Sequence, residues 1–343
     1  MHPPHLNLTR CANFVAILGA AFTMLAQTAL AQRFVFVTTR APEADFIAYD
    51  RPWQSEIFVY RDGSEIRLTH TTHASEYDPV PSPSGGLVAY VALDHTQEEA
   101  QSNWGWFLGV MDALTGRPVA KWPLPNTVGM TRPAGGIQPT WESEGAVLVQ
   151  VPSPVGEWEI HRFTVGEDAS VLITTGFGII RQPNGGVLAT QRADGVYLVD
   201  VASGSERRLG AGTPLAWWGS YLFVARVDSL LLVSAADGET RQISTERGFY
   251  TELRVDPATG RYAYLRLAED GTGSELVVAD AAHDVVMRYA ADGWLSGLDW
   301  LDEGSLVVAH EPLDGDTEIL ALDLMGRGFA VNSSGVDHSP RAF

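Results

Sequence analysis

Five histidines in segments that join predicted strands have side chains suited to a divalent metal, because imidazole is a common protein ligand for such ions. They are His70, His73, His95, His310 and His338. Four of them, His70, His73, His310 and His338, are the metal-ligand candidates, although no fixed spacing links them. Scattered loop histidines are also commonly plain polar residues. We therefore expect no cofactor and keep a divalent metal as the alternative.

Tryptophans in two long connections could form a recognition surface, because long loops on a rigid scaffold concentrate binding residues. The connections run from Arg40 to Trp53 and from Ala92 to Trp106. With nearby loop residues, the candidate ligand-binding or partner-binding residues are Trp53, His70, His73, His95, Trp104, Trp106, Asp337 and His338. The alternative is that each indole folds onto the strands below it and serves packing.

Signatures of the common catalytic machineries are absent from the sequence. There is no Gly-x-Ser-x-Gly elbow, no His-Glu-x-x-His motif, no phosphate-binding Gly-x-x-x-x-Gly-Lys and no paired cysteine motif. Asp314-Gly-Asp316 could offer carboxylates to calcium, but the full calcium-loop pattern is missing and a plain turn explains it. We assign no catalytic residue and favour a binding protein over an enzyme.

The elements that must position these residues form an internal repeat. One unit reads Glu56–Gly63, Glu65–Thr69, Asp78–Gly85 and Leu87–Ala92, which are apolar strands alternating with turns. The turn glycines in the second half of each unit lie at 85, 145, 185, 219, 260 and 304, separated by 60, 40, 34, 41 and 44 residues. A period near 40 with four strands per unit is typical of propeller blades, since each small sheet must bury both faces against its neighbours.

The two ends of the repeat complement each other. The chain ends in Asp337–Phe343, which matches the start of the segment at Asp78 but lacks the strand that should follow. That strand, Arg33–Thr39, begins the repeat instead. A ring closed by a blade that both termini share explains both ends and removes exposed sheet edges. We predict an all-β, seven-bladed β-propeller; six or eight blades are the alternatives, because the third and fourth units match least well.

One unit also resembles a known repeat. The segment Asp78-Pro-Val-Pro-Ser-Pro-Ser-Gly85, preceded by Glu65-Ile-Arg-Leu-Thr-His70, resembles the repeat of the TolB-like propellers, which runs Arg-Leu-Thr, a short loop, Pro-x-Trp-Ser-Pro-Asp-Gly and an apolar strand. In strand order the resemblance covers nearly all of the chain after residue 31. It implies the propeller fold. The sequence has no counterpart of the α/β domain that precedes the propeller in TolB, so it does not imply the role of TolB in the cell envelope.

The N-terminal segment is expected to direct export. Arg10 is its only formal charge, the run Cys11–Leu30 is mostly apolar, and Ala29-Leu-Ala31 is a small-x-small cleavage pattern. We therefore expect residues 1–31 to be a signal peptide and residues 32–343 to be a single propeller domain without a transmembrane segment. A membrane anchor is the alternative. The predicted location is periplasmic or secreted.

Net charge limits the choice of partner. The chain carries −19, which becomes −20 once Arg10 is removed with the signal, so nucleic acid is a poor partner. The only cysteine, Cys11, lies in the same segment, so the exported chain would contain no disulfide.

Two functions account for these features. The first is a periplasmic or secreted propeller that binds or scaffolds an envelope protein, a periplasmic protein or a small ligand through the loop face at the channel mouth. The second is a metal-dependent enzyme of the oligogalacturonate lyase type, a fold that resembles TolB repeats and uses a histidine-held metal. The acidic net charge argues against an anionic sugar as substrate.

Overall fold

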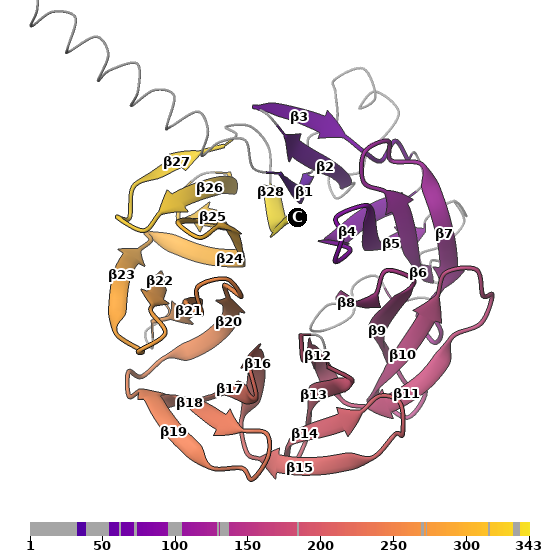
Figure 1. The fold of residues 1–343 in the computed structure, drawn as a ribbon. Coiled ribbons are helices and arrows are strands. Elements are labelled where there is room, and N and C mark those ends of the chain that lie inside the picture. Colours follow the sequence, from indigo (N-terminus) through magenta and orange to yellow (C-terminus); the bar gives the residue numbers. More distant parts are fainter. Residues whose placement is uncertain are drawn as a thin grey trace, which may run out of the picture.

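Seven antiparallel sheets surround a central axis (Figure 1). The computed structural model describes residues 33–38, 55–61, 63–71, 74–94, 105–128, 130, 137–183, 185–268, 271, 273–314, 316–331 and 337–343. Each sheet has four strands and forms one blade, so the prediction of an all-β, seven-bladed propeller is confirmed. Among the described residues, no helix is long and apolar enough to cross a membrane.

The blades follow one another along the chain, and the four strands of each run in order from the axis outward. Blade 1 contains β28 (Asp337–Ala342), β1 (Phe34–Thr38), β2 (Glu56–Arg61) and β3 (Ser64–Arg67). Blade 2 contains β4 (Ala74–Pro81), β5 (Leu87–Asp94), β6 (Gly105–Asp112) and β7 (Pro118–Pro123). Blade 3 contains β8 (Pro139–Ser143), β9 (Ala146–Pro152), β10 (Trp158–Thr164) and β11 (Val171–Thr175). Blade 4 contains β12 (Phe177–Arg181), β13 (Val187–Arg192), β14 (Gly195–Asp200) and β15 (Glu206–Gly210).

The remaining three blades repeat this order. Blade 5 contains β16 (Thr213–Trp218), β17 (Tyr221–Arg226), β18 (Ser229–Ser234) and β19 (Thr240–Ser244). Blade 6 contains β20 (Phe249–Val255), β21 (Tyr262–Leu267), β22 (Ser274–Ala279) and β23 (Val285–Ala290). Blade 7 contains β24 (Gly293–Asp302), β25 (Ser305–Pro312), β26 (Glu318–Asp323) and β27 (Gly328–Ala330).

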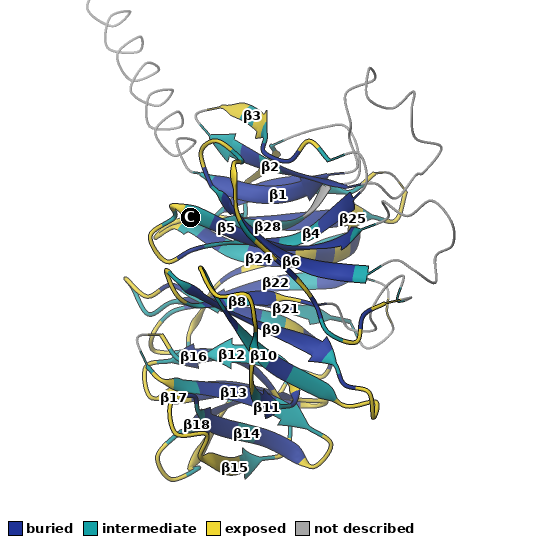
Figure 2. Ribbon diagram, turned by 90° about the vertical axis from the view of Figure 1, so that its right-hand side faces the viewer, coloured by how far each residue is buried: buried dark blue, intermediate teal, exposed yellow. Residues whose placement is uncertain are grey.

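Burial explains why the second strand of a blade is rich in apolar residues. Residues Val88–Leu93 of β5 are all buried, because both faces of a blade pack against neighbouring blades. The outermost strands face solvent on one side, and β19 is largely exposed. Figure 2, which views the disc from its edge, shows the buried strands inside and the exposed turns along both rims.

The ring closes within blade 1, as predicted. β28 pairs antiparallel with β1, with Phe34 opposite Ala342 and Thr38 opposite Asp337. Beyond this pairing, the Phe343 amide donates a hydrogen bond to the Arg33 carbonyl at 3.1 Å, and the Arg33 guanidinium lies 3.7 Å from the centre of the Phe343 ring. The two ends of the described propeller are therefore fastened by backbone bonds and a cation–π contact.

Three tryptophans on innermost strands connect neighbouring blades. Each stands in the place of the repeat's tryptophan, although only Trp141 has the proline of the Pro-x-Trp pattern two residues before it. The indole of each donates a hydrogen bond to a carbonyl of the preceding blade. The bonds are Trp141 to Val80 at 2.8 Å, Trp217 to Ile180 at 2.8 Å and Trp300 to Arg254 at 3.2 Å. The tryptophan of the repeat therefore both fills the space between blades and satisfies a backbone carbonyl beside the channel.

Candidate functional site

A cavity of about 940 Å³ occupies the axis of the propeller, and every blade contributes to its lining. One residue comes from an equivalent position in each innermost strand. These residues are Val80, Thr140, Ile180, Ala216, Arg254, Asp299 and Arg341. We call them the channel ring.

The tryptophan hydrogen bonds mark six of these seven positions, and Arg341 of β28 takes the seventh, two residues after a positive-φ residue like the one that precedes Val80. Val80, Ile180 and Arg254 supply the carbonyls that accept the three indoles. Thr140, Ala216 and Asp299 directly precede the three donating tryptophans. The ring residues therefore occupy the variable position of the Pro-x-Trp repeat. The strand fixes where each side chain lies, and the residue type differs from blade to blade.

A recurrent bulge shapes the strand before the ring residue. Two positions ahead of Val80 and Arg341, the non-glycine residues Asp78 and Ser339 have positive φ angles of 48° and 53°. Gly297, two positions before Asp299, has φ 66°, and an added Cβ there would meet the Pro340 Cδ at 2.5 Å. The bulge conformation thus admits Asp78 and Ser339, but at Gly297 the close approach of Pro340 leaves room for glycine alone.

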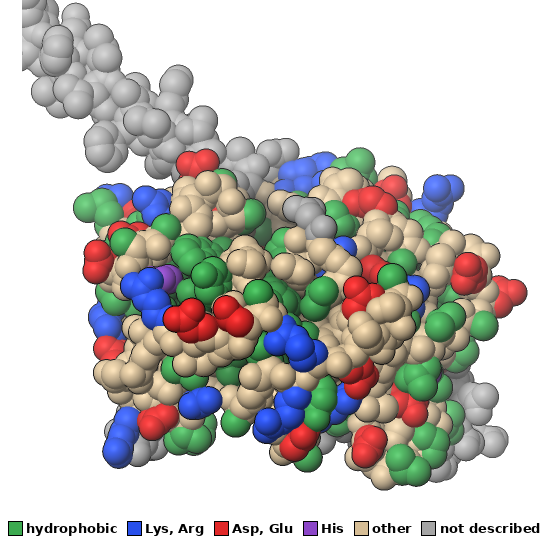
Figure 3. Space-filling view, turned by 60° about the horizontal axis from the view of Figure 1, so that its bottom comes forward, with side chains coloured by type: hydrophobic (Ala, Val, Ile, Leu, Met, Phe, Trp, Pro, Cys, Tyr) green, Lys and Arg blue, Asp and Glu red, His purple; other side chains and the backbone are tan. Residues whose placement is uncertain are grey.

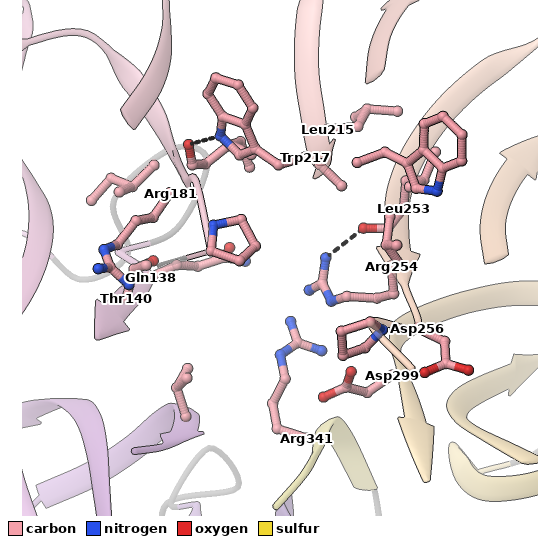
Figure 4. A pocket seen from close by; sticks show the side chains of 18 of the residues that line it. Gln138, Thr140, Arg181, Leu215, Trp217, Leu253, Arg254, Asp256, Asp299 and Arg341 are labelled. Atoms are coloured by element: carbon pink, nitrogen blue, oxygen red, sulfur yellow. Dashed lines mark hydrogen bonds between the residues drawn. The ribbon is translucent and has the colours of Figure 1, made fainter. Parts of the chain in front are cut away.

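Charged ring residues are confined to blades 6, 7 and 1. Figure 4 shows the guanidinium groups of Arg254 and Arg341 pointing toward each other, with Asp299 beside them. The two oxygens of Asp299 accept hydrogen bonds from the Trp300 amide and the Ala342 amide, each at 3.0 Å. Asp299 therefore anchors the β28 backbone, and its nearest hydrogen-bond partners are amides rather than guanidinium groups.

Repulsion between the two arginines affects Arg254. Confinement within the protein lowers the pKa of Arg254, and the charge of Arg341 lowers it further, while Glu252 and Asp299 act in the opposite direction. The Arg254 side chain is still 30% exposed, because it faces the open cavity. A guanidinium remains protonated in proteins, so two positive charges face this part of the channel.

The cavity opens among the turns that follow the innermost strands. Its lining continues into Pro183, Trp218, Tyr221 and Pro257. The Trp218 indole donates a hydrogen bond to the Gly260 carbonyl at 3.0 Å, and its ring lies 6.3 Å from that of Tyr221. Trp218 and Tyr221 of blade 5 therefore form an aromatic side of this mouth, and the Trp218 hydrogen bond joins it to blade 6.

Comparison with known proteins identifies the fold. No family model and no curated protein matches the sequence. Among solved structures, TolB from Acinetobacter baumannii matches with a TM-score of 0.50 and 14% identity, over 92% of this chain and 67% of that chain. AztD from Citrobacter koseri matches with a TM-score of 0.51 and 14% identity, over 91% of this chain and 98% of that chain. The chain has the fold of the TolB-like propellers.

Enzymes also have domains of this fold. An oligogalacturonate lyase in complex with manganese matches with a TM-score of 0.54 and 13% identity, over 82% of each chain. The chain also matches a prolyl endopeptidase with a TM-score of 0.61 and 16% identity, but it spans only 48% of that protein. At such identities the likeness establishes the TolB-like fold, and the function must be argued from the site.

Most of the predicted recognition residues lie outside the described part of the chain. They are Trp53, His73, His95 and Trp104, together with the side chains of Asp337 and His338, whose backbone lies in β28. The recognition surface built from them stays a prediction.

Trp106 is placed differently from its predicted position in a loop. It is the second residue of β6, pairs with Leu93 of β5 and is only 4% exposed. Its indole donates a hydrogen bond to the Met130 carbonyl at 2.8 Å. The apolar run of the strand continues through this residue, so its indole packs between blades 2 and 3, which matches the alternative of a packing role.

The side chains of two predicted metal ligands, His70 and His310, are described by the structure, and they do not form a common site. His70 is exposed, whereas His310 is 7% exposed, with its Nδ1 3.2 Å from the Glu318 Oε1 and its Nε2 3.2 Å from the Asp292 Oδ1. Neither lines the cavity. Within the described ranges, no group of three histidine, cysteine, aspartate or glutamate side chains is arranged to hold a metal. The alternative of a divalent metal therefore gains no ligand set from this part of the chain.

Proposed function

We propose that the protein is a periplasmic or secreted propeller that binds a small ligand in its channel. The cavity carries the proposal, because a volume of about 940 Å³ lined from all seven blades is a preformed site of the size that small ligands occupy. The predicted export signal supports the location. The predicted recognition of a protein or small ligand through the long connections stays a separate prediction, because it rests on other residues.

Filling the channel ring tests the proposal. In Ala216→Phe, a bulky ring would stand at a lining position of blade 5, and we expect it to abolish ligand binding. Binding would be measured as the rise in the thermal midpoint of unfolding across a panel of organic acids, sugars, amino acids, nucleosides and short peptides. A ligand that binds only the native state raises the midpoint.

The matched control places the same side chain away from the channel. Ala202 is an exposed turn residue between β14 and β15, so Ala202→Phe should bind ligands as the unchanged protein does. Circular dichroism would establish that both variants are folded. The proposal fails if no panel member binds, or if binding survives in Ala216→Phe.

A further inference from the structure

Two arginines in the channel have donors that the protein uses only in part. The Arg254 Nη1 donates to the Leu253 carbonyl at 3.0 Å, and the Arg341 Nη1 donates to the Pro340 carbonyl at 3.0 Å. A guanidinium has five N–H donors in a fixed fork. Most donors of both residues therefore remain available, and the two groups point toward each other within the cavity (Figure 4).

The nearby carboxylates are occupied by backbone amides. Glu252 lies 3.8 Å from Arg254, but its two oxygens accept hydrogen bonds from the Gly297 amide at 2.8 Å and the Leu298 amide at 3.1 Å. Asp299 is used in the same way by blade 7 and by β28. These acids reduce the repulsion between the arginines but accept no hydrogen bond from either guanidinium, so each guanidinium can still donate to another acceptor.

The other acids of the lining are held by neighbouring groups. Asp256 accepts hydrogen bonds from the Ala258 amide at 2.9 Å and from the Thr259 hydroxyl. Asp78 accepts a hydrogen bond from the Ser339 hydroxyl at 3.2 Å. By contrast, Arg181 lines the cavity and makes no hydrogen bond or ion pair with any residue in the described part of the chain. The charged groups of the cavity that still lack hydrogen-bond partners are therefore the arginine donors.

The opposite arc of the channel ring is apolar or uncharged. Val80, Thr140, Ile180 and Ala216 of blades 2 to 5 carry no charge, and the Trp218 and Tyr221 rings extend this side toward the mouth. Within the channel ring, the two arginines and Asp299 sum to one positive charge. Elsewhere in the lining, Arg181 of blade 4 adds a third guanidinium, and Asp78 and Asp256 accept hydrogen bonds from neighbouring groups. A ligand that matches both arcs has a single negative charge at one end and an apolar body.

We propose that the channel binds an organic monocarboxylate. Its carboxylate would be held by the guanidinium forks of Arg254 and Arg341, because planar bidentate pairing suits this group. Its apolar body would lie against blades 2 to 5. This inference rests on the proposed function and names the class of its ligand.

The acidic net charge does not conflict with this ligand. A charge of −19 spread over the surface acts through water and salt, which screen it within roughly 10 Å at ordinary ionic strength. Figure 3 shows acidic and basic side chains interspersed on the face that it presents. The arginines act at contact distance inside a cavity, where the effective dielectric constant is lower and a charged hydrogen bond is stronger. The local donors therefore outweigh the distant field.

Comparing each acid with its uncharged amide tests directly whether the site recognises a carboxylate. Isothermal titration would compare acetate, butyrate, phenylacetate and 3-phenylpropionate, each with its primary amide, and inorganic phosphate. We expect each bound acid to exceed its amide at least tenfold in affinity, and the affinity to rise with the size of the apolar body. Phosphate, with more charge and no apolar body, should bind more weakly than 3-phenylpropionate.

Charge-removing variants assign the contact. Arg341→Gln and Arg254→Gln should each weaken 3-phenylpropionate at least tenfold and leave its amide unchanged. Arg241→Gln is the matched control, because Arg241 is exposed on the outermost strand β19 and its replacement removes the same charge far from the axis. It should leave the affinity unchanged. Thermal midpoints would confirm that all three variants are folded, and Arg341→Lys would keep the charge while losing the fork.

The outcomes separate this inference from the proposed function. If Ala216→Phe abolishes the binding of some ligand but acids bind no better than amides, the channel remains a binding site and the assignment of a carboxylate ligand is wrong. The same conclusion follows if both glutamine variants bind 3-phenylpropionate normally. Tighter binding of phosphate than of every carboxylate also overturns the ligand class. If no compound binds, or if the acids bind equally well to Ala216→Phe, the channel itself is not the site.

Discussion

Replacing Trp217 with alanine should lower the free energy of unfolding by about 3–5 kcal/mol, the range typical of removing a large buried aromatic side chain. Trp217 is 4% exposed and packs with Ala189 and Leu198 of blade 4 and with Leu222 of its own blade. Its indole also satisfies the Ile180 carbonyl. The substitution would thus leave both a cavity between blades and a carbonyl without its donor. The shift would be measured by urea denaturation.

Two comparison variants separate packing from the hydrogen bond. Trp217→Phe keeps an aromatic ring but loses the N–H donor, so it should cost about 1–3 kcal/mol, the range for leaving a buried polar group unsatisfied. Trp294→Ala removes the same side chain from a position that is 42% exposed, and it should have a much smaller effect. Equal effects of Trp217→Ala and Trp294→Ala would refute the role of Trp217 in joining the blades.

Much of this fold can be predicted because its signals are local and repeated. Turn glycines and apolar runs recur in each unit, and each blade needs only its own four strands to be recognisable. Blade 4 is hard to count from sequence because β12, Phe177–Arg181, has neither the proline nor the tryptophan of the pattern. Its place is set instead by the Trp217 bond to Ile180, which is a contact made by the next blade.

The channel ring escapes prediction from sequence for a physical reason. Its members lie tens of residues apart and share no motif, since each is the variable residue of its repeat. Histidine and tryptophan content draws attention to the long connections, while Arg254, Asp299 and Arg341 look like ordinary strand residues. Aligning the units on the residue before Trp141, Trp217 and Trp300 places Asp299 on the axis, whereas Arg254 and Arg341 precede no tryptophan and are placed by the strand order of their blades. That alignment is the signal that the sequence contains.

A buried pair of acids between blades 1 and 2 gives the second large effect. Glu56 of β2 is 1% exposed and Glu76 of β4 is fully buried. Glu56 pairs with Arg67 at 2.6 Å and accepts a hydrogen bond from the Thr69 hydroxyl at 2.5 Å. Glu76 accepts one from the Thr71 hydroxyl at 2.6 Å, and its second oxygen has no hydrogen-bond partner in the described structure. Arg67 thus contacts Glu56, and its charge acts on Glu76 without a direct contact.

Burial raises the pKa of Glu76 well above its ordinary value, and the neighbouring charge of Glu56 raises it further. Burial also raises the pKa of Glu56, although Thr69 and Arg67 oppose this. The arrangement favours a neutral Glu76 beside an ionised Glu56 that is paired with Arg67. Removing the carboxylate of Glu56 would leave Arg67, whose side chain is only 11% exposed, without its partner. Glu56→Gln should therefore cost about 3–5 kcal/mol in urea denaturation at neutral pH.

Glu76→Gln should instead change how stability depends on pH. Because the folded-state pKa of Glu76 lies above its unfolded value near 4.5, the native protein holds this proton more tightly, and stability falls as pH rises from about 4.5 through the folded-state pKa. The slope from one such group is at most about 1.4 kcal/mol per pH unit. Glutamine resembles the neutral acid in shape, so Glu76→Gln should flatten this part of the urea-midpoint curve and lose little stability at its acidic end. An unchanged slope would show that Glu76 is not the group whose proton stabilises the junction of blades 1 and 2.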